Sequence, residues 1–196
     1  MSAINPNMGV SNIAQIDLSS MDIETALMMV QSQRVSMLDG QLKDQIAEVQ
    51  KRNELTGQLN EMQSKLNAMK ATLKNDAGAT DKIADTDANR QSAHEYASIA
   101  LSLGMSPDPI TVKNVQYDQN GAVKSFELDN WRPEKQNVER QLADVKSQLD
   151  TASNSQQMDM LRLQSMSNKR NEAFDVMTNF IKKMQDSRSS IIGNMR

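Results

Sequence analysis

The 196-residue chain has no cysteine, one histidine, four prolines and six aromatic residues, and these shortages exclude several classes of protein. Without cysteine there is no disulfide framework and no thiolate chemistry. Six aromatic side chains cannot fill a wide interior, because Phe, Tyr and Trp each bury more area than Leu or Met. The apolar residues are mostly aliphatic, with 15 methionines among them. This composition favours a thin core, such as a seam between helices.

Charge and hydropathy exclude further classes. Lys and Arg number 22 against 25 Asp and Glu, which gives a net charge of −3 and an isoelectric point of about 5.3. Nucleic-acid binding requires a basic stripe that neutralises phosphates, so we expect no nucleic-acid partner. No stretch approaches the roughly 18 uncharged apolar residues of a membrane-spanning helix, so we expect no membrane span. The first basic residue is Arg34, so we also expect no cleaved Sec signal.

The residue patterns that enzymes use are also missing. His94 is the single histidine and lies on a predicted helix, where we expect it at the surface. Asp85-Thr-Asp87 imitates the start of an EF-hand loop, but Arg90 stands where glycine is needed and Tyr96 where the bidentate Glu belongs. Zinc sites built from His and Cys are unavailable. We therefore predict no enzyme activity, no catalytic, cofactor-binding or metal-binding residues, and no cofactor.

Two long segments, residues 20–74 and 133–196, repeat apolar residues in alternating steps of three and four. This 3.5-residue period is typical of a coiled-coil seam, and we predict one long helix in each segment. Gly40 and Gly57 are the weak points of the first helix. Gln156, Asp159 and Arg170 interrupt the second, and such polar positions commonly fix register. The predicted intramolecular seam consists of Leu55, Leu59, Met62, Leu66, Val138, Leu142, Val145 and Leu149.

The remaining segments have different compositions. Residues 1–19 are polar and small, which predicts a disordered N-terminal arm. Residues 75–132 form an insertion, in which we predict a helix at 87–103 that stops at Gly104, followed by strands at 110–117 and 122–128. The strands flank an Asn-Gly turn, and we expect a bulge near Asn114. Pro133 suits the first turn of the second long helix, with Asp129 or Asn130 as its cap.

Together these patterns predict a mainly α fold: a long antiparallel coiled-coil hairpin with a small insertion made of a helix and a β-hairpin. Apolar residues at the free ends of both long helices exceed what one seam can bury. Either residues 21–38 complete a local three-helix core, or another subunit covers the excess, and the two are compatible. The predicted assembly contacts are Ile23, Leu27, Val30, Phe174, Phe180, Ile181, Ile191 and Ile192.

The layout resembles the needle-tip and filament proteins of bacterial type III secretion systems, namely the V-antigen-like group and its shorter filament-forming relatives. The clearest local match runs from Lys169 to Met184 and contains Asn179-Phe180-Ile181-Lys182-Lys183, which is similar to the terminal helix of that family. The resemblance covers the two long helices and leaves residues 75–132 unaccounted for.

The resemblance implies a secreted structural protein that self-assembles at the tip of a secretion needle, or as a filament on it, and supports delivery of effectors or translocators to host cells. It further implies export through the secretion channel without a cleaved Sec signal, guided by the N-terminal arm. The implied partners are further copies of the chain, the needle subunit, translocator proteins and a cytoplasmic chaperone before export. An alternative from another class is an intracellular coiled-coil adaptor or export chaperone.

Overall fold

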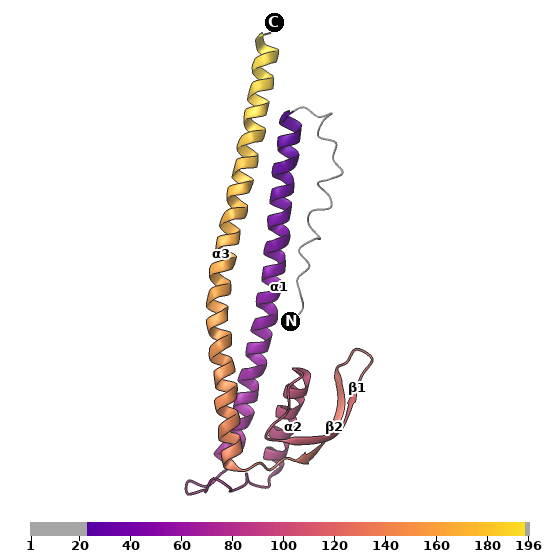
Figure 1. The fold of residues 1–196 in the computed structure, drawn as a ribbon, viewed down its shortest axis with the longest axis vertical. Coiled ribbons are helices and arrows are strands. Elements are labelled where there is room, and N and C mark those ends of the chain that lie inside the picture. Colours follow the sequence, from indigo (N-terminus) through magenta and orange to yellow (C-terminus); the bar gives the residue numbers. More distant parts are fainter. Residues whose placement is uncertain (1–22, 195–196) are drawn as a thin grey trace. The chain divides into compact units, whose positions relative to one another are not determined.

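The computed structural model describes residues 23–194, which are mainly helical as predicted. The helices are α1 (Ile23–Ala71), α2 (Asp87–Ser102) and α3 (Lys135–Asn194), and the antiparallel strands β1 (Thr111–Tyr117) and β2 (Val123–Asn130) form a hairpin (Figure 1). The predicted disordered arm, residues 1–19, lies outside the described residues.

The chain divides into two units. The central unit is Val49–Met158, and the terminal unit combines Met1–Glu48 with Asp159–Arg196. Both α1 and α3 contribute a segment to each unit, whereas α2 and the β-hairpin belong to the central unit alone. Each unit is therefore built around one segment of α1 and one segment of α3.

The core of the central unit lies where α1, α2 and α3 meet. Its buried side chains are aliphatic except for one tyrosine, and each fully buried Leu or Met contributes roughly 1.5–3 kcal/mol. Three alanines on α2 allow close approach of the helices, because their side chains end at Cβ. The buried cluster consists of Leu59, Met62, Leu66, Met69, Ile83, Ala93, Tyr96, Ala97, Ala100, Ile110, Val138 and Val145.

Two cross-helix contacts show that α1 and α3 run antiparallel in the central unit. Lys70 Nζ lies 3.0 Å from Glu139 Oε1, and the Gln156 side-chain amide donates a hydrogen bond to Asn53 Oδ1. The step back along α1 from Lys70 to Asn53 equals the step forward along α3 from Glu139 to Gln156. The two segments therefore keep a single register over that length.

Helix α2 begins directly after a residue that caps it, Thr86. Thr86 Oγ1 accepts a hydrogen bond from the Asn89 backbone amide at 3.2 Å, which satisfies one of the free N–H groups of the first turn. The Asn89 side chain is buried and donates to Thr72 Oγ1 at 2.8 Å and to the Ala84 carbonyl at 2.9 Å. This one amide therefore connects the end of α1 to the loop that precedes α2.

The predicted stop at Gly104 is confirmed. Gly104 has φ 69°, a conformation that costs L-residues with a side chain roughly 1–2 kcal/mol. Its amide donates to the Leu101 carbonyl at 3.0 Å, and the Met105 amide donates to the Ala100 carbonyl at 2.8 Å. These two bonds form a Schellman motif, which satisfies carbonyls of the last turn.

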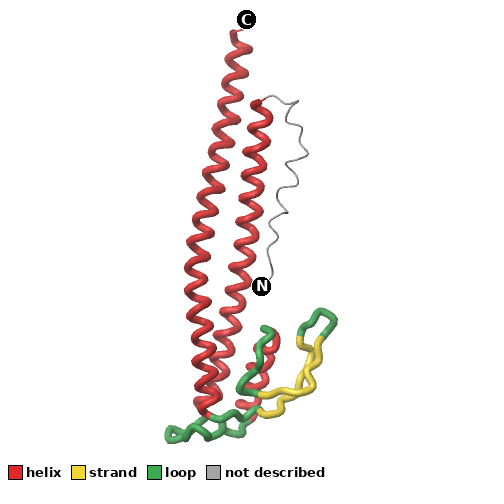
Figure 2. Tube along the Cα trace, in the orientation of Figure 1, coloured by secondary structure: helices red, strands yellow, loops and turns green. Residues whose placement is uncertain are grey.

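The hairpin also forms where predicted (Figure 2). Asp118 closes the turn: its amide donates to the Ala122 carbonyl, and its carboxylate accepts from the Asn120 and Ala122 amides at 2.8 Å. The strand pairing is irregular between Lys113 and Gln116, and Asn114 has φ 54°. The bulge expected near Asn114 is therefore confirmed.

The start of α3 differs from the prediction. Asp129 and Asn130 lie in β2 and do not cap the helix, and Pro133 precedes the first helical residue. Glu134 takes the capping position, because its carbonyl accepts the Val138 amide at 3.1 Å. The prediction failed because the loop before α2 holds this segment: the Ile83 amide donates to the Pro133 carbonyl, and Lys82 and Glu134 form an isolated β-bridge.

Gly57→Ala is expected to stabilise the protein. Gly57 lies inside α1, and an added Cβ would meet no atom within 4 Å. Alanine lowers the backbone entropy of the unfolded chain, so the free energy of unfolding should rise by roughly 0.5–1 kcal/mol. Urea unfolding followed by circular dichroism measures the change. Gly104→Ala is the matched control and should lower stability, because φ at that position is positive. A lower urea midpoint for Gly57→Ala would contradict the assignment of open space at this position.

Stability is expected to fall above about pH 10 because of Tyr96. Burial raises the pKa of the Tyr96 hydroxyl above its ordinary value, and this hydroxyl donates to the Asp108 carbonyl. The unfolded chain releases the phenolic proton near pH 10, whereas the folded chain retains it, so rising pH favours unfolding. Urea midpoints at about pH 9 and 11 measure the loss. Tyr96→Phe should reduce that pH dependence, whereas Tyr117→Phe, which removes an exposed phenol, should leave it unchanged.

Candidate assembly surface

Seven of the eight predicted seam residues lie in or against the core of the central unit. Those that are fully buried are Leu59, Met62, Leu66, Val138 and Val145, and those packed against them are Leu142 and Leu149. Leu55 is 37% exposed.

Leu55 lies at the edge of the seam because the repeat on α1 changes phase. In the central unit the buried or half-buried positions of α1 include Arg52, Thr56, Leu59 and Met62. The last two steps between them are of three residues each, whereas a regular repeat alternates steps of three and four. Leu55 then lines a shallow groove together with Arg52 and Leu59. A repeat extrapolated from the regular part of the sequence could not locate this shift.

Two of the polar residues that interrupt the seam of α3, Gln156 and Arg170, contact α1. Gln156 donates to Asn53 in the central unit, as described above. In the terminal unit Arg170 Nε donates to Asp39 Oδ1 at 2.8 Å. The Arg170–Asp39 pair is about half exposed and adds little stability, but a charged pair at one position disfavours shifted pairings.

The terminal unit leaves apolar side chains of α1 exposed. Ile23, Val30 and Met37 recur every seven residues, and Leu27 lies between the first two on the same side of the helix. Ile23 is 84% exposed and Val30 is 49% exposed. We call these four residues the α1 stripe. It is separate from the seam, which passes through Val35 on the same helix.

A second apolar stripe lies on α3. Met160, Phe174 and Ile181 are spaced by multiples of seven residues, and each directly follows a residue of the seam. Met160 is 67% exposed, Phe174 is 47% exposed, and Ile181 is half-buried. We call these three residues the α3 stripe.

The other predicted assembly contacts lie in several places. Phe180 is half-buried on the line of the seam, next to Ile181 of the α3 stripe. Ile192 is 69% exposed near the end of α3, and the side chain of Ile191 lies outside the described residues. Residues 23–38 belong to the unbroken helix α1 and do not form a separate third helix. The described part of the terminal unit therefore covers neither stripe.

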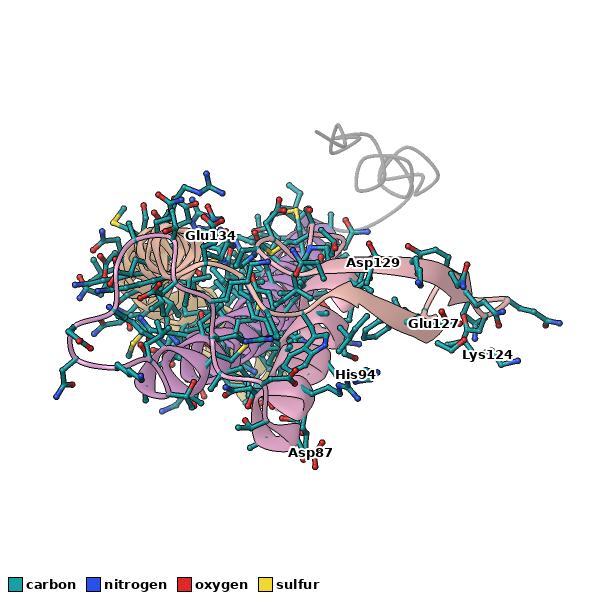
Figure 3. The ribbon with its side chains drawn as sticks, turned by 90° about the horizontal axis from the view of Figure 1, so that it is seen from below. Asp87, His94, Lys124, Glu127, Asp129 and Glu134 are labelled. Carbon is teal, nitrogen blue, oxygen red and sulfur yellow. The ribbon has the colours of Figure 1, made fainter. Side chains whose placement is uncertain are left out.

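The central unit carries a groove between α2 and the hairpin, with a volume of about 800 Å³. The guanidinium carbon of Arg90 lies 5.1 Å from the centre of the Trp131 ring, and His94 stacks on Phe126 with ring centres 4.4 Å apart. In Figure 3, Asp87 and His94 project from α2, and Glu127 lies on the neighbouring strand.

Charges on the rim of this groove are partly paired. Lys65 contacts Glu95, and this contact lowers the pKa of the Glu95 carboxyl and raises the pKa of the Lys65 amine. Lys113 lies 3.4 Å from Asp129. Among residues 23–194, no group of three or more His, Asp or Glu side chains is arranged to hold a metal ion. In the sequence, only the aromatic residues of the insertion indicated this groove, because its walls come from α2 and both strands of the hairpin and form when these pack together.

None of the described helices is both long and apolar enough to span a membrane. Neither α1 nor α3 contains a stretch apolar enough to cross a bilayer, although both have the length, and the shorter α2 does not qualify.

Gln45→Leu is expected to stabilise the terminal unit. Gln45 is 8% exposed on the seam of α1, and its side-chain NH2 has no hydrogen-bond partner among the described residues. A buried amide without a partner costs roughly 1–3 kcal/mol, so an apolar side chain of similar size should raise the free energy of unfolding by an amount of that order. Urea unfolding measures it. Gln156→Leu is the comparison: it removes a paired amide and should not give the same gain. Equal gains from both variants would contradict the role assigned to the missing partner.

Comparisons of this chain with known protein families, with curated proteins and with solved structures found no match.

Proposed function

We propose that the protein is a secreted structural protein that self-assembles at the tip of a bacterial type III secretion needle, or as a filament on it, and supports delivery of effectors or translocators to host cells. The observation that carries this proposal is the pair of exposed apolar stripes on the terminal unit. Exposed apolar surface of this kind, bordered by polar residues, commonly marks a protein–protein contact.

The finer fold that we propose is an antiparallel coiled-coil hairpin of α1 and α3. On α3, the positions reached from Val138 by alternating steps of four and three residues, as far as Met184, are all buried or half-buried. Gln156 and Arg170 are among them. The step along α1 from Asn53 to Asp39 equals the step along α3 from Gln156 to Arg170, so the pair in each unit supports the same register.

The resemblance to type III needle-tip and filament proteins supports the cellular setting. In this proposal the N-terminal arm guides export without a cleaved Sec signal, and a cytoplasmic chaperone holds the chain before export. The needle subunit and translocator proteins are the partners at the bacterial surface. The run from Asn179 to Lys183, which carries the local match, lies within the same α3 segment as the α3 stripe.

Replacing Phe180 and Ile181 by Asp should abolish assembly. A charge buried in an apolar contact is costly, and Ile181 belongs to the α3 stripe. Sedimentation velocity and negative-stain microscopy of the concentrated full-length protein measure assembly, and circular dichroism measures helical content. Because Phe180 also lies on the seam, Ile181→Asp alone tests the outer surface. Asn168→Asp with Ser189→Asp, at two exposed polar positions of the same helix that are not adjacent in sequence to a seam residue, is the matched control. Normal assembly of Ile181→Asp and of the double variant would refute this surface.

The same measurements separate the proposal from its alternative. Rods or rings of the wild-type protein support the structural role, whereas a uniform dimer at all concentrations supports an intracellular adaptor or export chaperone. Secretion of the intact chain through a type III apparatus, and its loss when residues 1–19 are deleted, would support the cellular setting. Retention of the intact chain inside cells would oppose it.

A further inference from the structure

We propose that Met37 and Met160 are oxidation-sensitive sites, at which an oxidant of the peroxide class converts the thioether to a sulfoxide and thereby blocks assembly. Each of the two apolar stripes carries one exposed methionine, Met37 on the α1 stripe and Met160 on the α3 stripe. This inference rests on the proposed function and adds a chemical modification that regulates it.

Solvent exposure divides the described methionines into groups of different reactivity. Met37 is 53% exposed and Met160 is 67% exposed, whereas Met62 and Met69 are fully buried in the core of the central unit. A dissolved oxidant reaches a sulfur atom only where solvent does, so the exposed methionines react in the folded protein and the buried pair reacts only on unfolding. Half-buried methionines should react at intermediate rates, and these are Met28, Met29, Met105, Met166, Met177 and Met184.

The reaction is a two-electron transfer of one oxygen atom. A lone pair on the thioether sulfur attacks one oxygen of hydrogen peroxide, so that a sulfur–oxygen bond forms and the oxygen–oxygen bond breaks. The sulfur is oxidised to the sulfoxide, and the peroxide is reduced to one molecule of water, which takes both protons. The chain has no cysteine, so no thiol within it competes for the oxidant.

A sulfoxide changes the surface that the proposed function uses. Met37 continues the seven-residue repeat of Ile23 and Val30 along α1, and Met160 belongs to the same repeat as Phe174 on α3. Oxidation turns an apolar side chain into a polar one, and burying the new oxygen in an apolar contact without a hydrogen-bond donor costs free energy. The sulfoxide therefore weakens the contact that covers a stripe, whichever surface of the neighbouring subunit supplies that contact.

The helices should tolerate oxidation at both positions. Met37 and Met160 are more than half exposed, so their sulfoxides remain in water and disturb no buried contact of the described chain. Neither residue belongs to the seam, which passes through Val35 on α1 and Asp159 on α3. Loss of assembly with unchanged helical content is therefore the expected effect of mild oxidation.

Peroxide treatment of the full-length monomer tests the proposal. Peptide mass spectrometry should show that Met37 and Met160 gain an oxygen atom before Met62 and Met69 do. After the treatment the wild-type protein should lose assembly in sedimentation velocity while its circular dichroism stays unchanged. Met37→Leu combined with Met160→Leu should assemble both before and after treatment, because leucine is apolar and contains no sulfur.

Met158→Leu is the matched control. Met158 is 69% exposed and so should react as readily as Met160, but it belongs to neither stripe. This variant should therefore lose assembly on oxidation as the wild type does. A second readout needs no variant: reductases for both sulfoxide epimers should restore assembly of the oxidised wild-type protein.

Contrary outcomes are defined for each step. If Met62 is oxidised as fast as Met160 in the folded protein, exposure does not control the reaction and the proposal is wrong. The proposal is also wrong if the oxidised wild-type protein assembles normally, if the double leucine variant loses assembly on oxidation, or if reduction of the sulfoxides restores nothing. In all these cases assembly of the untreated wild-type protein keeps the proposed function intact. An untreated protein that stays monomeric at high concentration overturns the proposed function as well.

Discussion

Burial of aliphatic side chains between long helices is the interaction on which the other features of the structure depend. With six aromatic residues in 196, the chain fills its core with Leu, Met, Ile, Val and Ala, and Tyr96 is the single aromatic among the fully buried residues of the described chain. A helix with one narrow apolar line buries that line against one neighbour. The central unit adds α2 as a further neighbour, and its alanines permit close packing. The terminal unit, within the described residues, has only α1 and α3.

This difference between the units explains where apolar surface remains. In the central unit α2, Ile83 and Ile110 cover the helix pair, so the seam residues there are buried on more than one side. No described element performs this role in the terminal unit, and both of its helices carry apolar residues outside the seam. The polar seam residues add specificity: Gln156 and Arg170 contact α1 through hydrogen bonds, which depend on direction and distance in a way that apolar contacts do not.

Much of the local structure could be predicted because local residues determine it. Gly104 ends α2 through its own positive φ, the turn at Asp118 is closed by its own carboxylate, and Asn114 marks the bulge. The start of α3 could not be predicted in the same way. Its position is set by hydrogen bonds from the loop before α2, which is distant in sequence. Asp129 and Asn130, the caps that the local sequence predicts, therefore belong to β2.

The candidate assembly surface shows the same division between local and distant causes. The sequence by itself determined the 3.5-residue period, the excess of apolar residues at the ends of the long helices and the short elements of the insertion, because these follow from the order of residues along the chain. Only the tertiary structure decided that Leu55 lies at the edge of the seam and that residues 23–38 form no third helix. The physical reason is that exposure depends on which segments pack together, and residues that are adjacent in a helix point to different neighbours.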